Sequence, residues 1–157
     1  MPDTTAAGAT IGAMIPTDGT RLEGVHCAMV IKAPAPGVVV VTIEGTDVGE
    51  LGEAPFRALE PLLLTGKLSE LFVDARKARG PSIDVSSDWA QWLTNHRARL
   101  LHVSMLTGSR FVQLSAGFVR SFADLGDIMR LYSDDRAFEG AVSNAVGNAH
   151  ARERTTL

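Results

Sequence analysis

Hydrophobic positions along the chain alternate between strand-length runs and stretches with helical spacing. Two β-branched runs come first, and the Pro34–Gly37 segment between them is rich in turn residues, so the chain should open with a β-hairpin. Later apolar runs are short, as in strands that are buried on both faces. The predicted strands are Val25–Ala33, Val38–Glu44, Leu71–Asp74, Leu100–Leu106 and Ile128–Tyr132.

Between the strands, apolar residues recur at helical intervals behind residues that cap helix N-termini. The first helix should begin near Asp47 and Glu50, which have capping-box spacing, and should break or start late because Pro61 cannot lie in a helix interior. The other three predicted helices start at Asp84–Ser87, Ser109 and Asp134. Their apolar stripes are Trp89, Trp92, Leu93 and His96; Phe111, Leu114, Phe118 and Phe122; and Phe138, Ala141, Val142 and Ala145.

Strands that alternate with helices of this length require right-handed crossovers and a largely parallel sheet. The sequence therefore predicts an α/β fold with a single-layer mixed, largely parallel sheet of about five strands and four helices. It predicts one domain over residues 21–148, after a flexible leader over 1–20 and before a polar, frayed tail over 149–157.

Composition and charge narrow the classes of function. The 157 residues are 45% hydrophobic and 21% charged, with a net charge of −3, so the basic patch expected of a nucleic-acid-binding domain is missing. Cys27 is the only cysteine, which excludes an intramolecular disulfide. No apolar run approaches the roughly 20 residues of a membrane span, and the N-terminal residues lack the pattern of a signal peptide. A cytoplasmic protein is expected.

Motifs for cofactor or metal binding are not found. Gly45, Gly49 and Gly52 follow a strand but match no phosphate-binding fingerprint. The four histidines are far apart in sequence, so no metal site and no cofactor is predicted. The histidines are His26, His96, His102 and His150.

Catalytic constellations are equally weak. Ser86, His96 and Asp74 can be named as a hydrolase triad, but the glycines of a nucleophile elbow are missing. Adjacent Asp134 and Asp135 are explained by the dipole of the helix that they begin. The sequence therefore predicts a protein that is not an enzyme.

Two further groups of residues have both a structural and a functional interpretation. Arg76, Lys77 and Arg79 follow a predicted strand, where open α/β folds bind ligands, but a solvated loop is the more common situation for such residues. Trp89 and Trp92 share one helix face, and paired tryptophans belong to a core more often than to a contact surface.

The order of these segments resembles the STAS/SpoIIAA-like superfamily over residues 22–147. The resemblance rests on the segments VVVVTIEGTD, LFVDARKARG, IDVSSDW, LHVSML, IMRLYSD and AFEGAV, in that order. It implies the fold described above, bacterial origin and a regulatory role that works through binding rather than catalysis.

Anti-sigma-factor antagonists of this superfamily carry a serine at the start of the helix after the central strand, and a partner kinase phosphorylates it. Ser86 occupies the matching place, with Ser87 beside it, while Asp84 and Asp88 lie on either side of the two serines. A phosphate there would add up to two negative charges to a docking surface. The alternative interpretation is that Ser86 or Ser87 is simply the N-cap, worth about 1 kcal/mol.

Two functions are therefore expected. The leading one is a regulatory domain that docks a protein partner, such as a kinase or an anti-sigma-type regulator, through Asp84, an exposed Ser86 and Asp88; a homodimer is compatible with it. The second, implied by a relationship to lipid-binding Sec14-type folds, is a module that binds an apolar or amphipathic molecule. The predicted pocket residues are Trp89, Trp92, Phe111, Leu114 and Phe118.

Overall fold

A six-stranded mixed sheet runs through the centre of the protein. The computed structural model describes residues 19–155 and orders the strands as they follow in sequence, from β1 to β6. The first three strands pair antiparallel and the last four pair parallel, which confirms the predicted largely parallel sheet with its opening hairpin. The strands are β1 (Thr20–Glu23), β2 (Cys27–Ala35), β3 (Val38–Asp47), β4 (Ser69–Pro81), β5 (Leu100–Leu106) and β6 (Met129–Tyr132).

The sheet has one strand more than the five that were predicted. The additional strand is β1, a short edge strand in which Leu22 pairs with Met29 of β2. Only four residues long and mostly polar, β1 gives no hydrophobic signal of its own, and Thr20 had been assigned to the leader. Residues 1–18 of that predicted leader lie outside the described residues.

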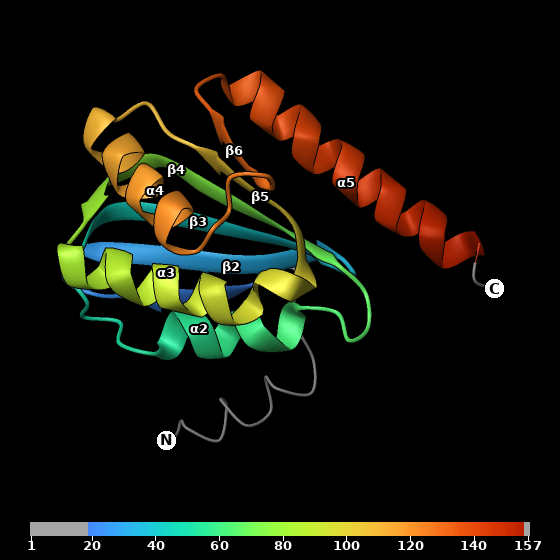
Figure 1. Cartoon of the computed structure of the whole chain (residues 1–157), viewed down its shortest axis with the longest axis horizontal. Helices are drawn as coiled ribbons and strands as arrows, with labels where there is room; N and C mark the ends of the chain where they lie inside the picture. The colour runs from blue at the N-terminus through green and yellow to red at the C-terminus, as the bar shows by residue number, and fades with distance from the viewer. Residues whose placement is uncertain (1–18, 156–157) are drawn as a thin grey trace.

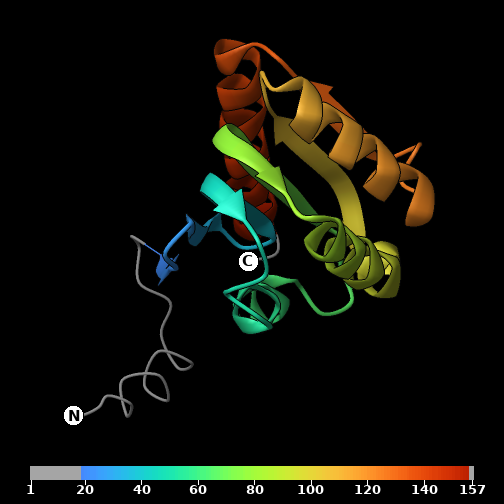
Figure 2. The same ribbon diagram turned by 90° about the vertical axis from the view of Figure 1, so that its left-hand side faces the viewer.

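Residues 19–155 contain four α-helices, the number predicted, and these helices lie on both faces of the sheet. Helices α2, α3 and α4 pack on one face and α5 packs on the other (Figures 1 and 2). The sheet is therefore the middle of three layers. The helices are α2 (Ala54–Leu59), α3 (Ile83–His96), α4 (Arg110–Phe122) and α5 (Asp135–Thr155), with single 3₁₀ turns at Glu60–Leu62 and Arg97–Arg99.

Alternation along β3 builds both cores, because successive side chains of a strand point to opposite faces. Val39 and Val41 contribute to the larger core under α2, α3 and α4, and Val38 contributes to the smaller core under α5. In β4, Phe72 packs against Phe138 of α5 with ring centroids 5.9 Å apart. The run of valines in β3 is thus apolar on both faces because both faces are covered.

Helix α5 is attached to the sheet by one arginine as well as by apolar contacts. Arg76 of β4 contacts Asp74 on its own strand at 2.9 Å and both Asp135 and Glu139 of α5 at 3.1 Å. These three carboxylates raise the pKa of the Arg76 guanidinium further above its usual value. The helix continues to Thr155, so residues 149–155, assigned from sequence to a frayed polar tail, are helical.

The basic cluster Arg76, Lys77 and Arg79 lies in a strand, so its interpretation as a solvated loop is wrong. β4 continues to Pro81 because β3 extends alongside it as far as Asp47, with register shifts after Thr42 and Gly45. Polar side chains dominate this half of β4, which is why its length has no hydrophobic signature.

Two of the helix starts differ from the prediction. The N-cap of α3 is Ser82, whose Oγ accepts the Val85 N–H at 3.2 Å, so neither Ser86 nor Ser87 is the cap. The capping box at Asp47 and Glu50 is also wrong. Glu50 instead accepts backbone N–H groups of the β1–β2 loop, including that of His26 at 2.7 Å.

The two possible caps of α3 can be distinguished by stability measurements. Ser82→Ala should lower the free energy of unfolding by about 1 kcal/mol, because the Val85 N–H loses its acceptor. Ser87→Ala should change it by less than about 0.5 kcal/mol, because this half-buried side chain caps nothing. Urea denaturation followed by circular dichroism measures both values. Equal effects of the two substitutions would contradict this assignment.

Candidate functional site: an apolar cavity between the sheet and helices α3 and α4

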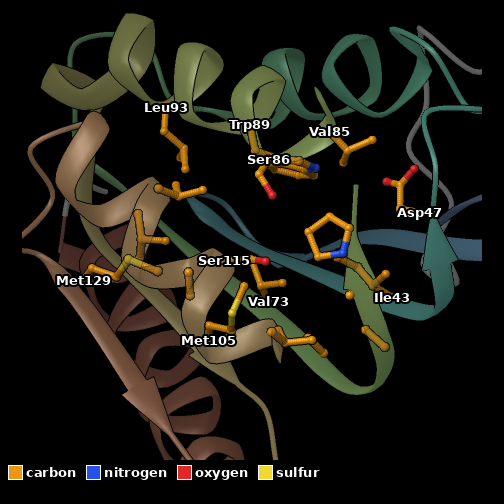
Figure 3. Close-up of a pocket in the computed structure, with 18 of the residues that line it drawn as sticks. Ile43, Asp47, Val73, Val85, Ser86, Trp89, Leu93, Met105, Ser115 and Met129 are labelled. Carbon is orange, nitrogen blue, oxygen red and sulfur yellow. The ribbon is translucent and has the colours of Figure 1, made fainter. Parts of the chain in front are cut away.

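A cavity of about 80 Å³ lies between the sheet and helices α3 and α4. Its walls are almost entirely apolar and come from six elements, β3, β4, β5, β6, α3 and α4. Figure 3 shows how side chains from these elements surround the space. Residues of its wall include Ile43 of β3, Val73 of β4, Met105 of β5, Leu93 of α3 and Val112 of α4.

Small side chains create this space. Ala75, Ala78 and Gly80 line the cavity from β4, and Ala116 lines it from α4. These residues are too short to fill the gap between the layers, and the larger side chains around them do not close it. Gly80 has a φ of +127°, and a Cβ there would collide with the ring of Phe111. The ring therefore lies directly against the backbone of a cavity-lining residue.

Ser86 is the main polar feature of the cavity. Its side chain is 6% exposed, and its hydroxyl points from α3 into the cavity (Figure 3). Among residues 19–155, no group accepts from or donates to this hydroxyl. Ser115 of α4 also lines the cavity, but its Oγ already donates to the Phe111 carbonyl at 3.2 Å. Ser86 is thus left to bond with something that enters the cavity.

Asp47 lies at one end of the cavity, close to Val85 (Figure 3). This carboxylate is only 7% exposed, and its Oδ1 accepts the Gly49 N–H at 3.0 Å. The Asp47 carbonyl accepts the N–H of Ser82 at 2.9 Å, which joins the end of β3 to the start of α3. A buried carboxylate at this end favours a neutral or cationic ligand group over an anionic one.

The structure separates the residues predicted for partner docking. Ser86 is buried, so the expectation that it is exposed is wrong, whereas Ser87 is half-buried and Asp84 and Asp88 are exposed. Phosphorylation at either serine stays a prediction. Helical spacing could have revealed this difference, because Ser86 is four residues before the buried Ala90 and seven before the buried Leu93.

The predicted pocket residues also separate. Trp89 lines the cavity, but Trp92 does not: it is buried beneath α2, stacked on the ring of His96 at 4.3 Å. Phe111, Leu114 and Phe118 were expected inside and instead face outward, with 57%, 74% and 44% of each residue exposed.

Helix α4 carries two apolar stripes, and the smaller one is buried. Val112, Ala116 and Val119 pack inward, whereas the larger side chains form an exposed surface, here called the α4 stripe. Short side chains let the helix approach the sheet closely, which the phenylalanines would prevent. The α4 stripe consists of Phe111, Leu114, Phe118 and Phe122.

The residues named as a hydrolase triad do not meet. Ser86 and His96 are ten residues apart on one helix, a rise of about 15 Å. His96 lies near Glu60 at 3.1 Å, and Asp74 contacts Arg76. Within residues 19–155, no group of three or more His, Cys, Asp or Glu side chains is placed to hold a metal ion. No helix in this part of the chain is long and apolar enough to cross a membrane.

Comparisons with known proteins identify the fold alone. No protein-family model matches the sequence, and no curated protein is significantly similar to it. Among solved structures, the chain is similar to an uncharacterised protein of the DUF3478 family from Shewanella loihica PV-4, described as having a SpoIIAA-like fold. The TM-score is 0.57 at 14% identity, and the match covers 77% of this chain and 98% of the other.

The reactivity of the Cys27 thiol tests whether this residue is buried in the folded protein. Burial, and secondarily the carboxylates of Asp47 and Glu50, raises the pKa of the Cys27 thiol to about 11. At pH 8 the folded protein should therefore hold about 100-fold less thiolate than a cysteine of ordinary pKa, and iodoacetamide should modify it correspondingly slowly. Intact-protein mass spectrometry measures the rate, with the urea-unfolded chain as control. Equal rates in the two states would contradict the buried position.

Proposed function

We propose that this protein, which has a SpoIIAA-like fold, is a binding module for a small, mainly apolar molecule with one hydrogen-bonding group. The observation that carries the proposal is Ser86, a buried residue whose hydroxyl has no partner among the described residues and faces an apolar cavity. A buried polar group without a partner costs about 1–3 kcal/mol, so a ligand group that bonds to it binds favourably. The apolar walls would supply the remaining affinity.

The size of the cavity limits the ligand. At about 80 Å³ it is smaller than typical pockets for drug-sized molecules and smaller than the cavity of roughly 150 Å³ that accepts benzene. It fits a few heavy atoms or the end of an aliphatic chain. A longer molecule would extend past Phe111, the ring that covers Gly80. Asp47 disfavours a carboxylate at its end of the cavity, so the polar group is expected to be a hydroxyl or an amide.

A second function, a protein-interaction domain, is supported by the α4 stripe. Four large apolar side chains in a row on one helix face form an exposed patch of the kind that marks interaction sites. We assign this surface to a second copy of the chain, packed with the two α4 helices antiparallel. Arg110 at the start of α4 would then lie beside Asp124 and Asp127, just past the helix end in the partner subunit. This arrangement pairs opposite charges at both ends of the apolar contact.

Regulation by phosphorylation stays a separate prediction. A kinase would reach the half-buried Ser87 more readily than Ser86, whose hydroxyl faces the interior. Modification of Ser86 would require α3 to move away from the sheet.

Titration with 1-hexanol tests the ligand-binding function. It should produce saturable shifts in the methyl NMR signals of Val103 and Val112, which line the cavity. Ala116→Leu fills the cavity and should abolish these shifts, whereas Leu114→Gln, on the exposed face of the same helix, should leave them unchanged. Equal shifts in the Ala116→Leu protein would refute binding in this cavity.

The role of Ser86 is tested with the same titration. Ser86→Ala removes one hydrogen bond and leaves the apolar walls intact, so 1-hexanol should bind about 5-fold more weakly. Binding of n-hexane, which has no polar group, should not weaken. A Ser86→Ala protein that binds 1-hexanol as well as the parent would show that this hydroxyl does not contact the ligand.

Sedimentation velocity tests the interaction domain. The parent chain should sediment as a dimer, and Leu114→Glu should make it monomeric, whereas Leu68→Glu, at an exposed leucine before β4, should not. Arg110→Glu should weaken the dimer and Asp127→Lys should restore it in the double variant. Even weak, transient pairs associate at concentrations on the order of 100 micromolar. A parent chain that is still monomeric at that concentration would contradict this assignment.

A further inference from the structure

We propose that a groove between α5 and the strands β5 and β6 is a second binding site, specific for a small organic anion that carries a carboxylate or phosphate on an apolar body. The groove has a volume of about 530 Å³, within the range of ligand pockets. Helix α5 covers the face of the sheet opposite α3 and α4 (Figure 2). The groove, which α5 lines, is therefore separate from the apolar cavity.

The groove exists because α5 packs closely over only part of the sheet. Ala145 and Ala149 of α5 are buried in a cluster with Ala35 and Val38 of the antiparallel strands. Between Arg136 and Arg152, the residues that α5 turns towards the groove are mostly small or short and polar, so they leave space above the sheet. These side chains are Ala137, Gly140, Ala141, Asn144 and Asn148.

Charge in the groove is opposite to that of the whole chain. Its lining contains Arg130, Arg136 and Arg152 against Glu70, so three positive charges minus one negative charge give +2 with His102 neutral. The chain as a whole carries −3. A concave surface with this excess of guanidinium groups attracts anions, and the planar guanidinium matches the oxygen pairs of a carboxylate or phosphate.

Arg130 is held in position by a hydrogen-bonded chain across three strands. Its Nη2 lies 2.9 Å from Nε2 of His102, and Nδ1 of His102 lies 3.3 Å from Oε1 of Glu70. Because a guanidinium only donates, His102 accepts at Nε2 and carries its proton at Nδ1, facing Glu70. One of the five N–H donors of Arg130 is used in this way. The others remain available to an anion.

Ser104 adds a second observation that points to a ligand. It is 2% exposed, lines the groove, and has no side-chain hydrogen bond to any residue from 19 to 155. Ser104 pairs in register with Arg130 on the neighbouring strand, so the hydroxyl and the guanidinium emerge side by side. Together they form a donor pair of the kind that fixes an anionic group.

The rest of the lining determines the body of the ligand. Phe72 and Tyr132 provide aromatic surface on the sheet side, and Ala141 and Ala145 provide aliphatic surface on α5. An inorganic ion would leave these surfaces uncovered. A flat organic anion, with its charged end at Arg130 and its ring between sheet and helix, would use both halves of the groove.

Calorimetric titration with phenyl phosphate, benzoate and inorganic phosphate tests this site in the full chain. At least one of the two ring-bearing anions should bind saturably, and inorganic phosphate should bind at least about 10-fold more weakly, because it lacks the apolar body. Arg130→Gln should weaken the binding about 10-fold or more. Arg57→Gln, at an exposed position of α2 on the opposite face, should not change it. Since neither arginine lines the apolar cavity, the outcome is independent of binding there.

A matched pair of glycine substitutions guards against misfolding of the Arg130 variant. A Cβ added at Gly140 or Gly147 meets no atom within 4 Å, and leucine favours the helix at both positions. Only Gly140 lines the groove, so Gly140→Leu should abolish anion binding and Gly147→Leu should not. The proposal is overturned if neither ring-bearing anion binds saturably, if inorganic phosphate binds as tightly, if Arg130→Gln binds unchanged, or if the two leucine variants bind alike.

Discussion

The long parallel pairing of β3 with β4 is the constraint on which the rest of the structure depends. Residues Val38 to Val41 of β3 pair one by one with Glu70 to Val73 of β4 in unbroken register, and apart from Glu70 these residues are apolar and face both cores. Such strands cannot be left with one face in water. Helices must therefore cover both sides, and the two sides receive different helices. The apolar cavity and the cationic groove lie on opposite sides for this reason.

Helix α5 packs on a smaller apolar core than the helices on the other face of the sheet, and polar interactions partly replace apolar packing there. Phe138 anchors its start in the smaller core, and Arg76 links it to β4 through carboxylates on both elements. A partly exposed network of this kind contributes modestly to the free energy of unfolding, but it fixes the direction of α5 across the sheet. With the angle of α5 set by these contacts, its small side chains over β5 and β6 leave space rather than closing on the sheet.

Elements with a strong hydrophobic period were predictable from the sequence, and elements defined by their neighbours were not. Leu100–Leu106 was predicted with the bounds of β5, and Ser109 was predicted as the N-cap of α4, because apolar pattern and capping residue are both local signals. In contrast, β1 and the second half of β4 are polar. They are strands only because β2 and β3 offer them hydrogen-bonding edges. The sequence of a segment that pairs with such an edge need not itself show a strand pattern.

The candidate site shows the same division. Trp89 could be placed at a ligand cavity from its position on α3, but the burial of Ser86 depends on Ser82 starting the helix one turn earlier than the sequence suggested. That shift places Ser86 inside the helix instead of at its first residue. Once it is helical, its spacing from Ala90 and Leu93 puts it on the buried face, so an error of one turn in the cap turns a cavity residue into a predicted surface serine.

Helix α4 connects the cavity to the exposed surface. Its two apolar stripes compete for the sheet, and hydrophobic area alone favours burying the phenylalanines. The sheet beneath carries small residues at this point: Ala75, Ala78 and Gly80 allow a close approach that suits the shorter side chains of Val112, Ala116 and Val119. Burying the small stripe leaves the cavity, because small side chains on both layers do not fill the space between them. The same choice leaves the α4 stripe in solvent. The cavity and the α4 stripe therefore have the same cause, the burial of the smaller side chains of α4. A substitution that turned α4 over would remove both.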